Sequence, residues 1–566
     1  MQSSKQENHE RRDMTNKAIL RRVLVLTVAM IGHAAVGYTQ ELRDMIQPVK
    51  IFTGKPDTFA VNDLFYAKEY GLRFIDNERI AVAYDQSNRS VVLRPKNGFV
   101  GAALVEFVHQ GRSYAWPVIV ENDVSAQQRH VFTYSPQSKV SRVAVTGSFN
   151  NWNMAGDELV DEKGTGTYEL ALPLEPGSYI YKCIVDGKEV LDPANPEKSP
   201  TGFDDFNSVL RVVDPDTARL FLHVGGIKAA GNEKVLSFIY ESSHQTSPLT
   251  KDNIVALIDN QRINARKIAI QGEVVSLRFT KTELKGEKTI RVMVSQHGKQ
   301  TNLQQVILRN GGPVGVGTKV ITWEDGVIYS IMIDRFSNGD RTNDKPIEHD
   351  SIFVQANYQG GDIRGIINRI EEGYFDSLGV NILWISPVYD NPNIAFREYP
   401  PPHRWYSGYH GYWPISDTRV EEHFGTMEEL KELVAQAHRR GIRVLLDFVA
   451  HHVHIDHPFY KEHPEWFGTL DLPDGRKNLR LWDEFRLTTW FEPYMPSFDF
   501  TRSQEALEVV SRNAIWWLKE TGADGFRHDA VKHVPNAFWR ELTRKLKAEI
   551  EVPQRTKVYQ IGETFG

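Results

Sequence analysis

The sequence predicts a multidomain protein in which N-terminal all-β modules of the Ig-like or β-sandwich type precede an incomplete (β/α)8 TIM barrel. The chain has 566 residues, which is more than one hydrophobic core normally serves. Residues 38 to about 310 carry short alternating apolar runs separated by turn signals, as β domains do. From about residue 318, strand patterns alternate with helical patterns, which is typical of βα units around a parallel sheet.

The β-rich part divides into three regions by its turn and linker signals. The predicted domains are a β-rich domain of unknown role at 38–125, a β-sandwich at 126–213 and an Ig-like β domain at 214–312. Glycine and proline at 311–313 mark a linker to the barrel, which we place at 313–566. Residues 452–502, approximately, have few regular signals and are interpreted as an insertion after the third barrel strand.

The barrel region contains five apolar strand candidates, at 327–333, 381–388, 443–449, 525–530 and 558–562. Two helices between them are well marked. Thr426 can cap the first, with Glu429 completing a capping box and Gly441 ending it. The second is predicted from Ser503 to Gly522, with an apolar stripe facing inward.

Composition narrows the class of protein. The net charge is −6 and the single cysteine, Cys183, excludes an intramolecular disulfide. We find no basic stripe and therefore expect no nucleic-acid partner. Residues 1–37 show the order of a secretory signal peptide: basic residues, an apolar run from Val23 to Ile31, then small residues. We expect export to the periplasm or the extracellular space and no stable membrane span after cleavage.

Charged residues stand where the predicted barrel strands end, the face on which such barrels build active sites. Asp334 and Arg335 end the first strand and Asp447 ends the third. Arg527 and Asp529 end the fourth, and Glu563 ends the fifth. Retaining glycosidases hold two carboxyl groups about 5 Å apart, roughly the spacing of neighbouring strands. The pattern predicts Asp529 as nucleophile and Glu563 as general acid/base. We expect Arg527, on the same strand face, to keep Asp529 ionised.

These segments resemble the motifs of the α-amylase family, glycoside hydrolase family 13. Its nucleophile motif resembles Gly-Phe-Arg-His-Asp-Ala-Val-Lys-His at 525–533, and its other motifs resemble 379–388, 411–413, 447–452 and 562–563. The resemblance implies a retaining hydrolase that cleaves α-glucosidic bonds in starch, glycogen or maltodextrins through a covalent glucosyl-enzyme. It further implies substrate contacts from the following residues: Arg527, His452, Tyr412, Trp413, Lys532 and His533.

Two loops also resemble the calcium loop of cyclodextrin glucanotransferases and neopullulanase-like amylases. Hard cations such as Ca²⁺ bind several carboxylate, amide and carbonyl oxygens. The matching ligands are Asn338, Asp340, Asn343, Asp344, the Gly360 carbonyl and Asp362. The alternative is a polar surface turn, which the same residue types favour. The family's other calcium site uses an asparagine where this chain has His451, so we expect that site to be absent or altered.

Residues 126–213 resemble the glycogen-binding-like sandwich, carbohydrate-binding module family 48. Its glucan contacts correspond to Trp152 and Lys182. The family's second stacking tryptophan is missing, and Glu189 stands near its place, so a spacer role is an equal alternative to α-glucan binding.

Two other functions stay open at this stage: an α-glucan transglycosylase of the same family, and a non-catalytic glucan-binding or scaffold protein. The family also uses a third carboxylate at the end of the seventh barrel strand. Because five strands cannot close a barrel, we expect the printed chain to be truncated after its fifth strand, poorly active and prone to aggregate.

Overall fold

The computed structural model describes most of the chain from residue 42 to residue 564. The described residues are 42, 44–122, 129–150, 152–154, 156–201, 205–213, 219–243, 247–296, 298–314, 323, 326–482, 484–554 and 556–564. The predicted signal peptide at 1–37 lies outside them, and export therefore stays a prediction.

The first β region is built from two sheets around one core. Its sheets have the strand orders β1-β7-β6-β3 and β2-β5-β4. Trp116 and Phe107 are fully buried between them. The elements are β1 (Val49–Phe52), β2 (Asp57–Ala60), α2 (Val61–Leu64), β3 (Leu72–Phe74), β4 (Ile80–Asp85), β5 (Ser90–Pro95), β6 (Gly101–His109) and β7 (Arg112–Glu121).

The second region is also a two-sheet β module, with the strand orders β10-β9-β12-β15-β14 and β11-β8, and β13 paired to β12. Cys183 is buried in its core. Its strands are β8 (Arg129–Tyr134), β9 (Val143–Gly147), β10 (Glu158–Leu159), β11 (Tyr168–Pro173), β12 (Gly177–Val185), β13 (Lys188–Val190), β14 (Lys198–Pro200) and β15 (Phe206–Val212).

The third region has the strand orders β16-β17-β21-β20 and β19-β18-β22-β24-β25, with β23 paired to β22. Its main elements are β16 (Leu220–Ala230), β17 (Glu233–Ser242), β18 (Ile254–Ile258), β19 (Gln261–Arg262), β20 (Ile268–Gln271), β21 (Val274–Thr280), β22 (Glu287–Gln296), β23 (Lys299–Gln300), β24 (Gln304–Arg309) and β25 (Gly312–Pro313).

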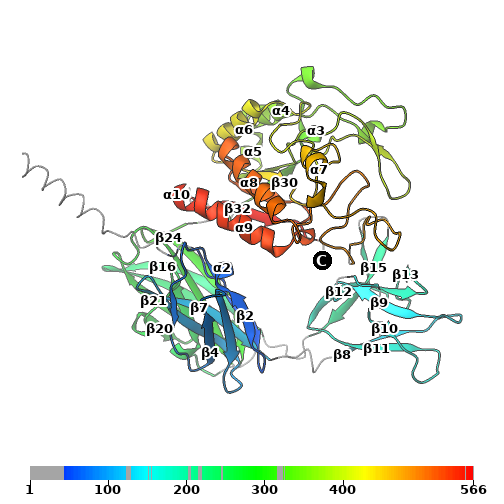
Figure 1. The fold of residues 1–566 in the computed structure, drawn as a ribbon. Coiled ribbons are helices and arrows are strands. Elements are labelled where there is room, and N and C mark those ends of the chain that lie inside the picture. The colour runs from blue at the N-terminus through cyan, green and yellow to red at the C-terminus, as the bar shows by residue number, and fades with distance from the viewer. Residues whose placement is uncertain are drawn as a thin grey trace, which may run out of the picture.

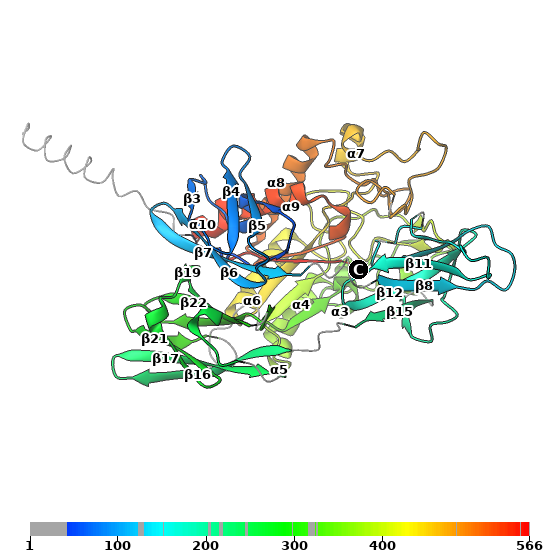
Figure 2. The same ribbon diagram turned by 90° about the horizontal axis from the view of Figure 1, so that it is seen from below.

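The first and third β regions pack directly on each other, although the module lies between them in sequence. The Arg291 guanidinium, buried to 1% exposure, donates to the Ile46 carbonyl at 2.6 Å and to Asn260 Oδ1 at 2.8 Å. Asn260 in turn donates to the Asp44 carbonyl at 2.8 Å. Figures 1 and 2 both show these two regions side by side, with the module standing apart from them. The two regions therefore form one platform, and the module extends from it.

The barrel region forms one parallel sheet of five strands in the order β26-β27-β30-β31-β32. All five predicted strands are therefore confirmed. They are β26 (Ile328–Ile331), β27 (Ile382–Ile385), β30 (Arg443–Phe448), β31 (Gly525–His528) and β32 (Tyr559–Gly562). The outer strands β26 and β32 have no further partner among the described residues, and Ile328 and Ile561 are each 38% exposed. This open sheet is consistent with an incomplete barrel.

Both predicted helices are confirmed, with their caps. Thr426 and Glu429 form the capping box of α6 (Met427–Arg439). Ser503 caps α8 (Gln504–Thr521), which ends at Gly522 with φ of 74°. The helices of the barrel region are α3 (Ile333–Phe336), α4 (Ile363–Glu371), α5 (Tyr374–Ser377), α6, α7 (Pro458–Glu462), α8, α9 (Asn536–Leu546) and α10 (Val552–Gln554). Among the described residues, none is both long and apolar enough to cross a bilayer.

The first predicted strand ends earlier than expected. β26 stops at Ile331, and Asp334 lies instead on the short helix α3. Its carboxylate accepts hydrogen bonds from the backbone N–H of Gln359, at 2.9 and 3.0 Å. The Arg335 guanidinium donates to the Asn357 carbonyl at 3.0 Å. These two charges therefore fasten the loop at 355–360 rather than join the acids of the later strands.

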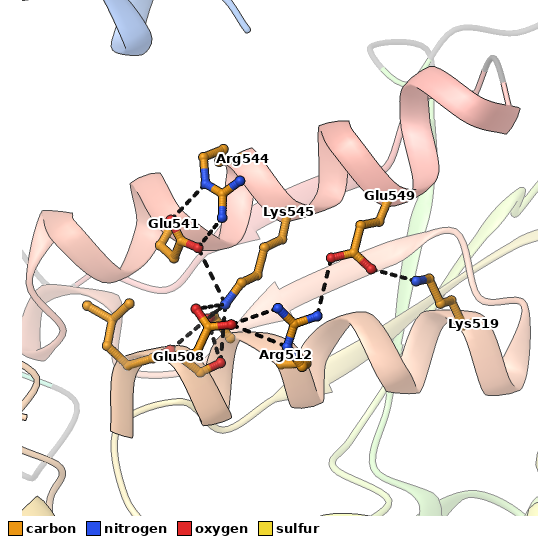
Figure 3. A network of polar contacts seen from close by, with 9 residues as sticks. Glu508, Arg512, Lys519, Glu541, Arg544, Lys545 and Glu549 are labelled. Atoms are coloured by element: carbon orange, nitrogen blue, oxygen red, sulfur yellow. Dashed lines mark hydrogen bonds and ion pairs between the residues drawn. The ribbon is translucent and has the colours of Figure 1, made fainter. Parts of the chain in front are cut away.

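Helices α8 and α9 are joined by a network of charges around one buried lysine (Figure 3). Lys545 is 1% exposed, and its ammonium donates to Glu508 Oε2 at 2.6 Å and to Ser511 Oγ at 2.7 Å. Nearer the start of α9, Arg540 forms a bidentate ion pair with Asp63 of the first β region, with both hydrogen bonds at 2.7 Å. Helix α9 thus links the barrel sheet to the N-terminal platform.

The substitution Lys545→Met tests the buried part of this network. It keeps much of the side-chain volume but removes the Lys545 donor from Ser511 Oγ and Glu508 Oε2, so we expect a loss of about 2 kcal/mol in unfolding free energy. The control Arg512→Met removes a cation that is 57% exposed and should cost less than about 1 kcal/mol. Denaturant unfolding, with hydrogen exchange at α8 and α9, measures both. Equal losses in the two variants would contradict this account.

Candidate active site

The candidate active site lies at the carboxyl ends of β30, β31 and β32. Asp447 on β30 and Arg527 on β31 are direct partners in the parallel pairing. Asp529 and Glu563 each follow the last residue of their strand. The Asp529 N–H donates to the Phe448 carbonyl at 3.1 Å, and the Glu563 N–H donates to the His528 carbonyl at 3.0 Å. The sheet hydrogen bonding thus extends one residue further and brings both acids to the same edge.

One guanidinium contacts three carboxylates at this edge. Arg527 Nη1 donates to Asp447 Oδ1 and to Asp529 Oδ1, both at 2.9 Å. Its Nη2 lies 2.8 Å from Glu563 Oε2. The Arg527 side chain is only 7% exposed, and its pairs with Asp447 and Asp529 are shielded from water, whereas Glu563 is 30% exposed. Asp529 and Glu563 therefore flank a single planar cation.

Asp447 holds this guanidinium in place. Its Oδ2 accepts hydrogen bonds from the Tyr412 hydroxyl at 2.8 Å and from Trp384 Nε1 at 2.9 Å. The Arg527 Cζ lies 5.0 Å from the centre of the Trp384 ring, within the range of a cation–π contact. Sequence reasoning noted Asp447 as a strand end but gave it no role, and it did not single out Trp384. The polar end of its strand was the available signal for Asp447, and we find no comparable signal for Trp384.

Burial dominates the charge state of the cluster. Desolvation, with Asp447 and Glu563 nearby, raises the pKa of Asp529 to about 8, although Arg527 acts in the opposite direction. Burial likewise raises the pKa of Asp447 to about 6, against the lowering effect of Arg527. Burial therefore opposes the predicted effect of Arg527, which lowers the pKa of Asp529 and favours its ionised form. One cation is shared among three carboxylates, which is too little to offset their burial.

Several residues with implied sugar contacts surround this cluster. Tyr412 is half-buried and points its hydroxyl at Asp447. His533 is 5% exposed, and its Nδ1 lies 2.8 Å from the Arg486 carbonyl. Lys532, beside it, is half-buried. His452 is 1% exposed, and both of its ring nitrogens are hydrogen-bonded within the protein. The structure thus brings these four side chains to the strand-end face, and their sugar contacts stay predictions.

Trp413 is buried in an aromatic cluster and does not face the strand-end site. Its indole is 5% exposed and packs edge-on against Phe396 and Tyr494, with ring centres 5.7 and 5.1 Å apart. It therefore belongs to a small aromatic core behind Tyr412.

In the β module, the lysine with an implied glucan contact is held by two acids. Lys182 is 8% exposed, and its ammonium lies 2.9 Å from Glu189 and 2.5 Å from Asp205. Trp152 is half-buried with φ of 62°. The carboxylate at the place of the missing tryptophan thus binds the very lysine that would meet a sugar.

The six candidate calcium ligands come together only in part. Asn338 Nδ2 donates to both oxygens of Asp344, at 2.8 and 2.9 Å. A side chain at Gly360 would come within 2.4 Å of the Asp344 carboxylate, so this position requires glycine. Asn343 Oδ1 is buried without a partner among the described residues. These are oxygens that a cation could use.

The other two candidate calcium ligands, Asp362 and Asp340, already accept hydrogen bonds from backbone N–H groups. Asp362 caps α4 and accepts from three backbone amides, and Asp340 accepts from Thr342. Within the described part of the chain, histidine, cysteine, aspartate and glutamate side chains form no metal-holding group of three. The donor set therefore fits a calcium ion only if the amide and carbonyl oxygens take part.

Comparison with protein families decides the nature of the barrel segment. Residues 330–561 match the family described as the α-amylase catalytic domain. The barrel segment is thus similar to the α-amylase catalytic domain. Residues 129–218 match the glycogen recognition site of AMP-activated protein kinase, so the β module has a glycogen-recognition fold ahead of the amylase domain.

The relatives described here each match about two fifths of this chain. α-Amylase 2 of Dictyoglomus thermophilum is 30% identical over 257 residues, covering 43% of this chain and 40% of the relative. A cyclomaltodextrin glucanotransferase of Geobacillus stearothermophilus is 28% identical over 262 residues, covering 43% and 35%. An Anoxybacillus α-amylase structure has 33% identity, coverage of 43% and 48%, and a TM-score of 0.36. The chain thus spans less than half the length of these relatives.

The substitution Asp529→Asn tests the charge state of the site. A pKa of about 8 in the folded chain, above 3.8 when unfolded, means that Asp529 stabilises the fold at low pH. This contribution is lost as pH rises through about 8. The asparagine variant should therefore match the wild type near pH 4 and become progressively more stable than it up to about pH 8. Thermal unfolding across this range measures the difference.

The control for this titration is Asp350→Asn, at an exposed position. Its effect on the melting temperature should not vary with pH over the same range. A constant offset for Asp529→Asn would contradict the burial argument.

Proposed function

We propose that this protein is a retaining glycoside hydrolase that cleaves α-glucosidic bonds in starch, glycogen or maltodextrins. The observation that carries the proposal is the contact of one buried guanidinium, Arg527, with both Asp529 and Glu563 at neighbouring strand ends. Two acids on adjacent strands favour the short carboxylate spacing of retaining enzymes over the wider spacing that leaves room for a water molecule. The relatives' amylase and glucanotransferase names support the α-glucan class.

Each acid has a separate role in this proposal. Asp529 attacks the anomeric carbon while Glu563 gives its proton to the leaving glycosidic oxygen, which forms the glucosyl-enzyme. Glu563 then takes a proton from water, and the water oxygen displaces Asp529 from the sugar. The N–H of Ala530, at 3.3 Å, and Arg527 Nη2 both reach Glu563 Oε2. The other oxygen, Oε1, is therefore the one suited to carry the proton.

The charge state of Asp529 must change when substrate binds. Burial raises the pKa of Asp529 and so favours its protonated form in the ligand-free protein, whereas attack requires the carboxylate. The 2.9 Å bond from Arg527 and the positive charge that develops on the sugar both favour the ionised form. Asp447 competes for the same guanidinium, so its hydrogen bonds from Tyr412 and Trp384 help by satisfying its second oxygen.

Transglycosylation is the second candidate function of the same site. The chain is similar to cyclomaltodextrin glucanotransferases as well as to amylases. In that reaction a sugar hydroxyl takes the place of water in the second step. Incubation with maltoheptaose at rising maltose concentration separates the two, because transfer gives products longer than the substrate.

Trapping the covalent intermediate tests the proposal directly. In Glu563→Gln, a glucosyl fluoride with fluorine at C5 should still react, since fluoride leaves without a proton, and mass spectrometry should place the adduct on Asp529. The same variant should lose about 10²- to 10⁴-fold in starch cleavage. Asp529→Asn should form no adduct. An adduct on another residue, or starch cleavage by Asp529→Asn equal to that of a wild type with measurable activity, would refute the mechanism.

We further propose that the loop with Asn338, Asn343, Asp344 and the Gly360 carbonyl binds Ca²⁺. The support is the unpartnered Asn343 oxygen and the fit of Asp344 over a glycine. Bound calcium would offset the negative charge of the loop's aspartates and fix the loop beside α4. It has no part in the proposed reaction steps.

Chelation tests the calcium proposal. Removing calcium from the wild type should lower the melting temperature, and millimolar Ca²⁺ should restore it, as one-site linkage requires. Asp344→Ala should abolish the calcium dependence, while Asp350→Ala, at an exposed position outside the loop, should keep it. Calorimetry with Ca²⁺ alone gives the affinity. A wild-type melting temperature that ignores both chelator and calcium would contradict the proposal.

A further inference from the structure

Two adjacent histidines follow β30 and are buried beside the candidate active site. His451 and His452 are each 1% exposed. Their Nδ1 atoms lie 3.2 Å apart, and His452 Nε2 lies 3.0 Å from the carbonyl oxygen of Tyr412. His451 Nε2 is buried without a hydrogen-bond partner among the described residues. Three of the four ring nitrogens are thus engaged and one is not.

The contacts fix where the protons are. A carbonyl oxygen only accepts, so His452 Nε2 must carry a hydrogen. Burial lowers the pKa of His452 to about 4 and that of His451 well below its usual range, so both rings are neutral. His452 Nδ1 is then a bare acceptor, and His451 Nδ1–H is the donor to it. The unpartnered His451 Nε2 is consequently a bare lone pair, whereas a charged His452 would leave a buried N–H there unsatisfied.

This pair connects to the acids through one residue. Tyr412 receives the His452 hydrogen bond at its carbonyl, and its hydroxyl donates to Asp447 at 2.8 Å. Asp447 binds Arg527, which binds Asp529. Both ring nitrogens of His452 are hydrogen-bonded within the protein in this arrangement, and Nε2 holds the backbone of Tyr412.

We propose that His451 is a positioning residue: it holds His452 as the Nε2–H tautomer and thereby fixes Tyr412 against Asp447. Without the His451 donor, the Nδ1–H tautomer of His452 becomes competitive. That tautomer would turn a bare Nε2 toward the Tyr412 carbonyl, and two acceptors cannot bond. The consequence for sugar binding rests on the proposed function, whereas the tautomer itself does not.

The aromatic packing around His451 suits this role. Its ring lies 4.5 Å from the Phe491 ring and 5.5 Å from the His533 ring, centre to centre. Phe491 belongs to the segment predicted as an insertion, and His533 follows the nucleophile strand. These two rings, whose centres lie 5.3 Å from each other, pack against His451 and limit its rotation, which keeps Nδ1 directed at His452.

The test uses the full chain labelled with ¹⁵N-histidine, in a chelating buffer that removes calcium. His451→Asn keeps an N–H near the place of Nδ1, His451→Gln moves it outward, and His451→Leu removes it. Signals of His452 are assigned by their loss in His452→Gln. We expect a protonated Nε2 and a bare Nδ1 on His452 in the wild type and in His451→Asn, and mixed tautomers in the other two. A wild-type His452 protonated at Nδ1, or one tautomer in all variants, overturns the proposal.

Ligand binding supplies the second readout. Calorimetry with maltoheptaose should show about tenfold weaker binding for His451→Leu and His451→Gln, and near wild-type binding for His451→Asn, since one buried hydrogen bond is lost or kept. Absence of maltoheptaose binding by the wild type would count against the proposed function, while the ¹⁵N spectra would still decide the tautomer. If His451→Leu does not fold, the wild-type, Asn and Gln spectra decide it.

Discussion

The amylase domain depends on one buried cation, Arg527, which serves three carboxylates at the ends of adjacent strands. Removing such a guanidinium would leave several negative charges in a water-poor site, a far larger cost than losing a surface ion pair. The two bonds to Asp529 and Glu563 fix the distance between the acids, and the bond to Asp447 fixes the guanidinium itself. Catalytic geometry and charge balance thus have the same physical origin in this site.

The remaining side chains near the site act mainly by restraining this cluster. Tyr412 and Trp384 satisfy the second oxygen of Asp447, and the paired histidines restrain Tyr412. Such a buried polar network is stabilising only when nearly every member has a partner. The lone acceptor left over on His451 is the least costly place for the exception, because the atom carries no hydrogen.

The three β regions differ in how they contact the rest of the protein. The first and third β regions are fastened by Arg291 and Asn260, and Asp63 of the first region pairs with Arg540 of α9. The glycogen-recognition module stands apart from these two β regions in Figures 1 and 2. In the module, Glu189 stands near the place of the family's second stacking tryptophan and forms an ion pair with Lys182. The two β regions therefore support the barrel sheet, and the glycogen-recognition module is a separate unit.

The sequence by itself determined the elements whose signals are local. The capping box at Thr426 and Glu429 and the five apolar strands are written in short stretches of chain, because caps and side-chain alternation depend on nearby residues. Strand-end position also indicated which acids would meet. Only the tertiary structure decided how one guanidinium is divided among three acids, that Trp413 is core, and that the charge on Asp529 is opposed by burial. Those outcomes depend on desolvation and on partners far away in sequence, which no local pattern encodes.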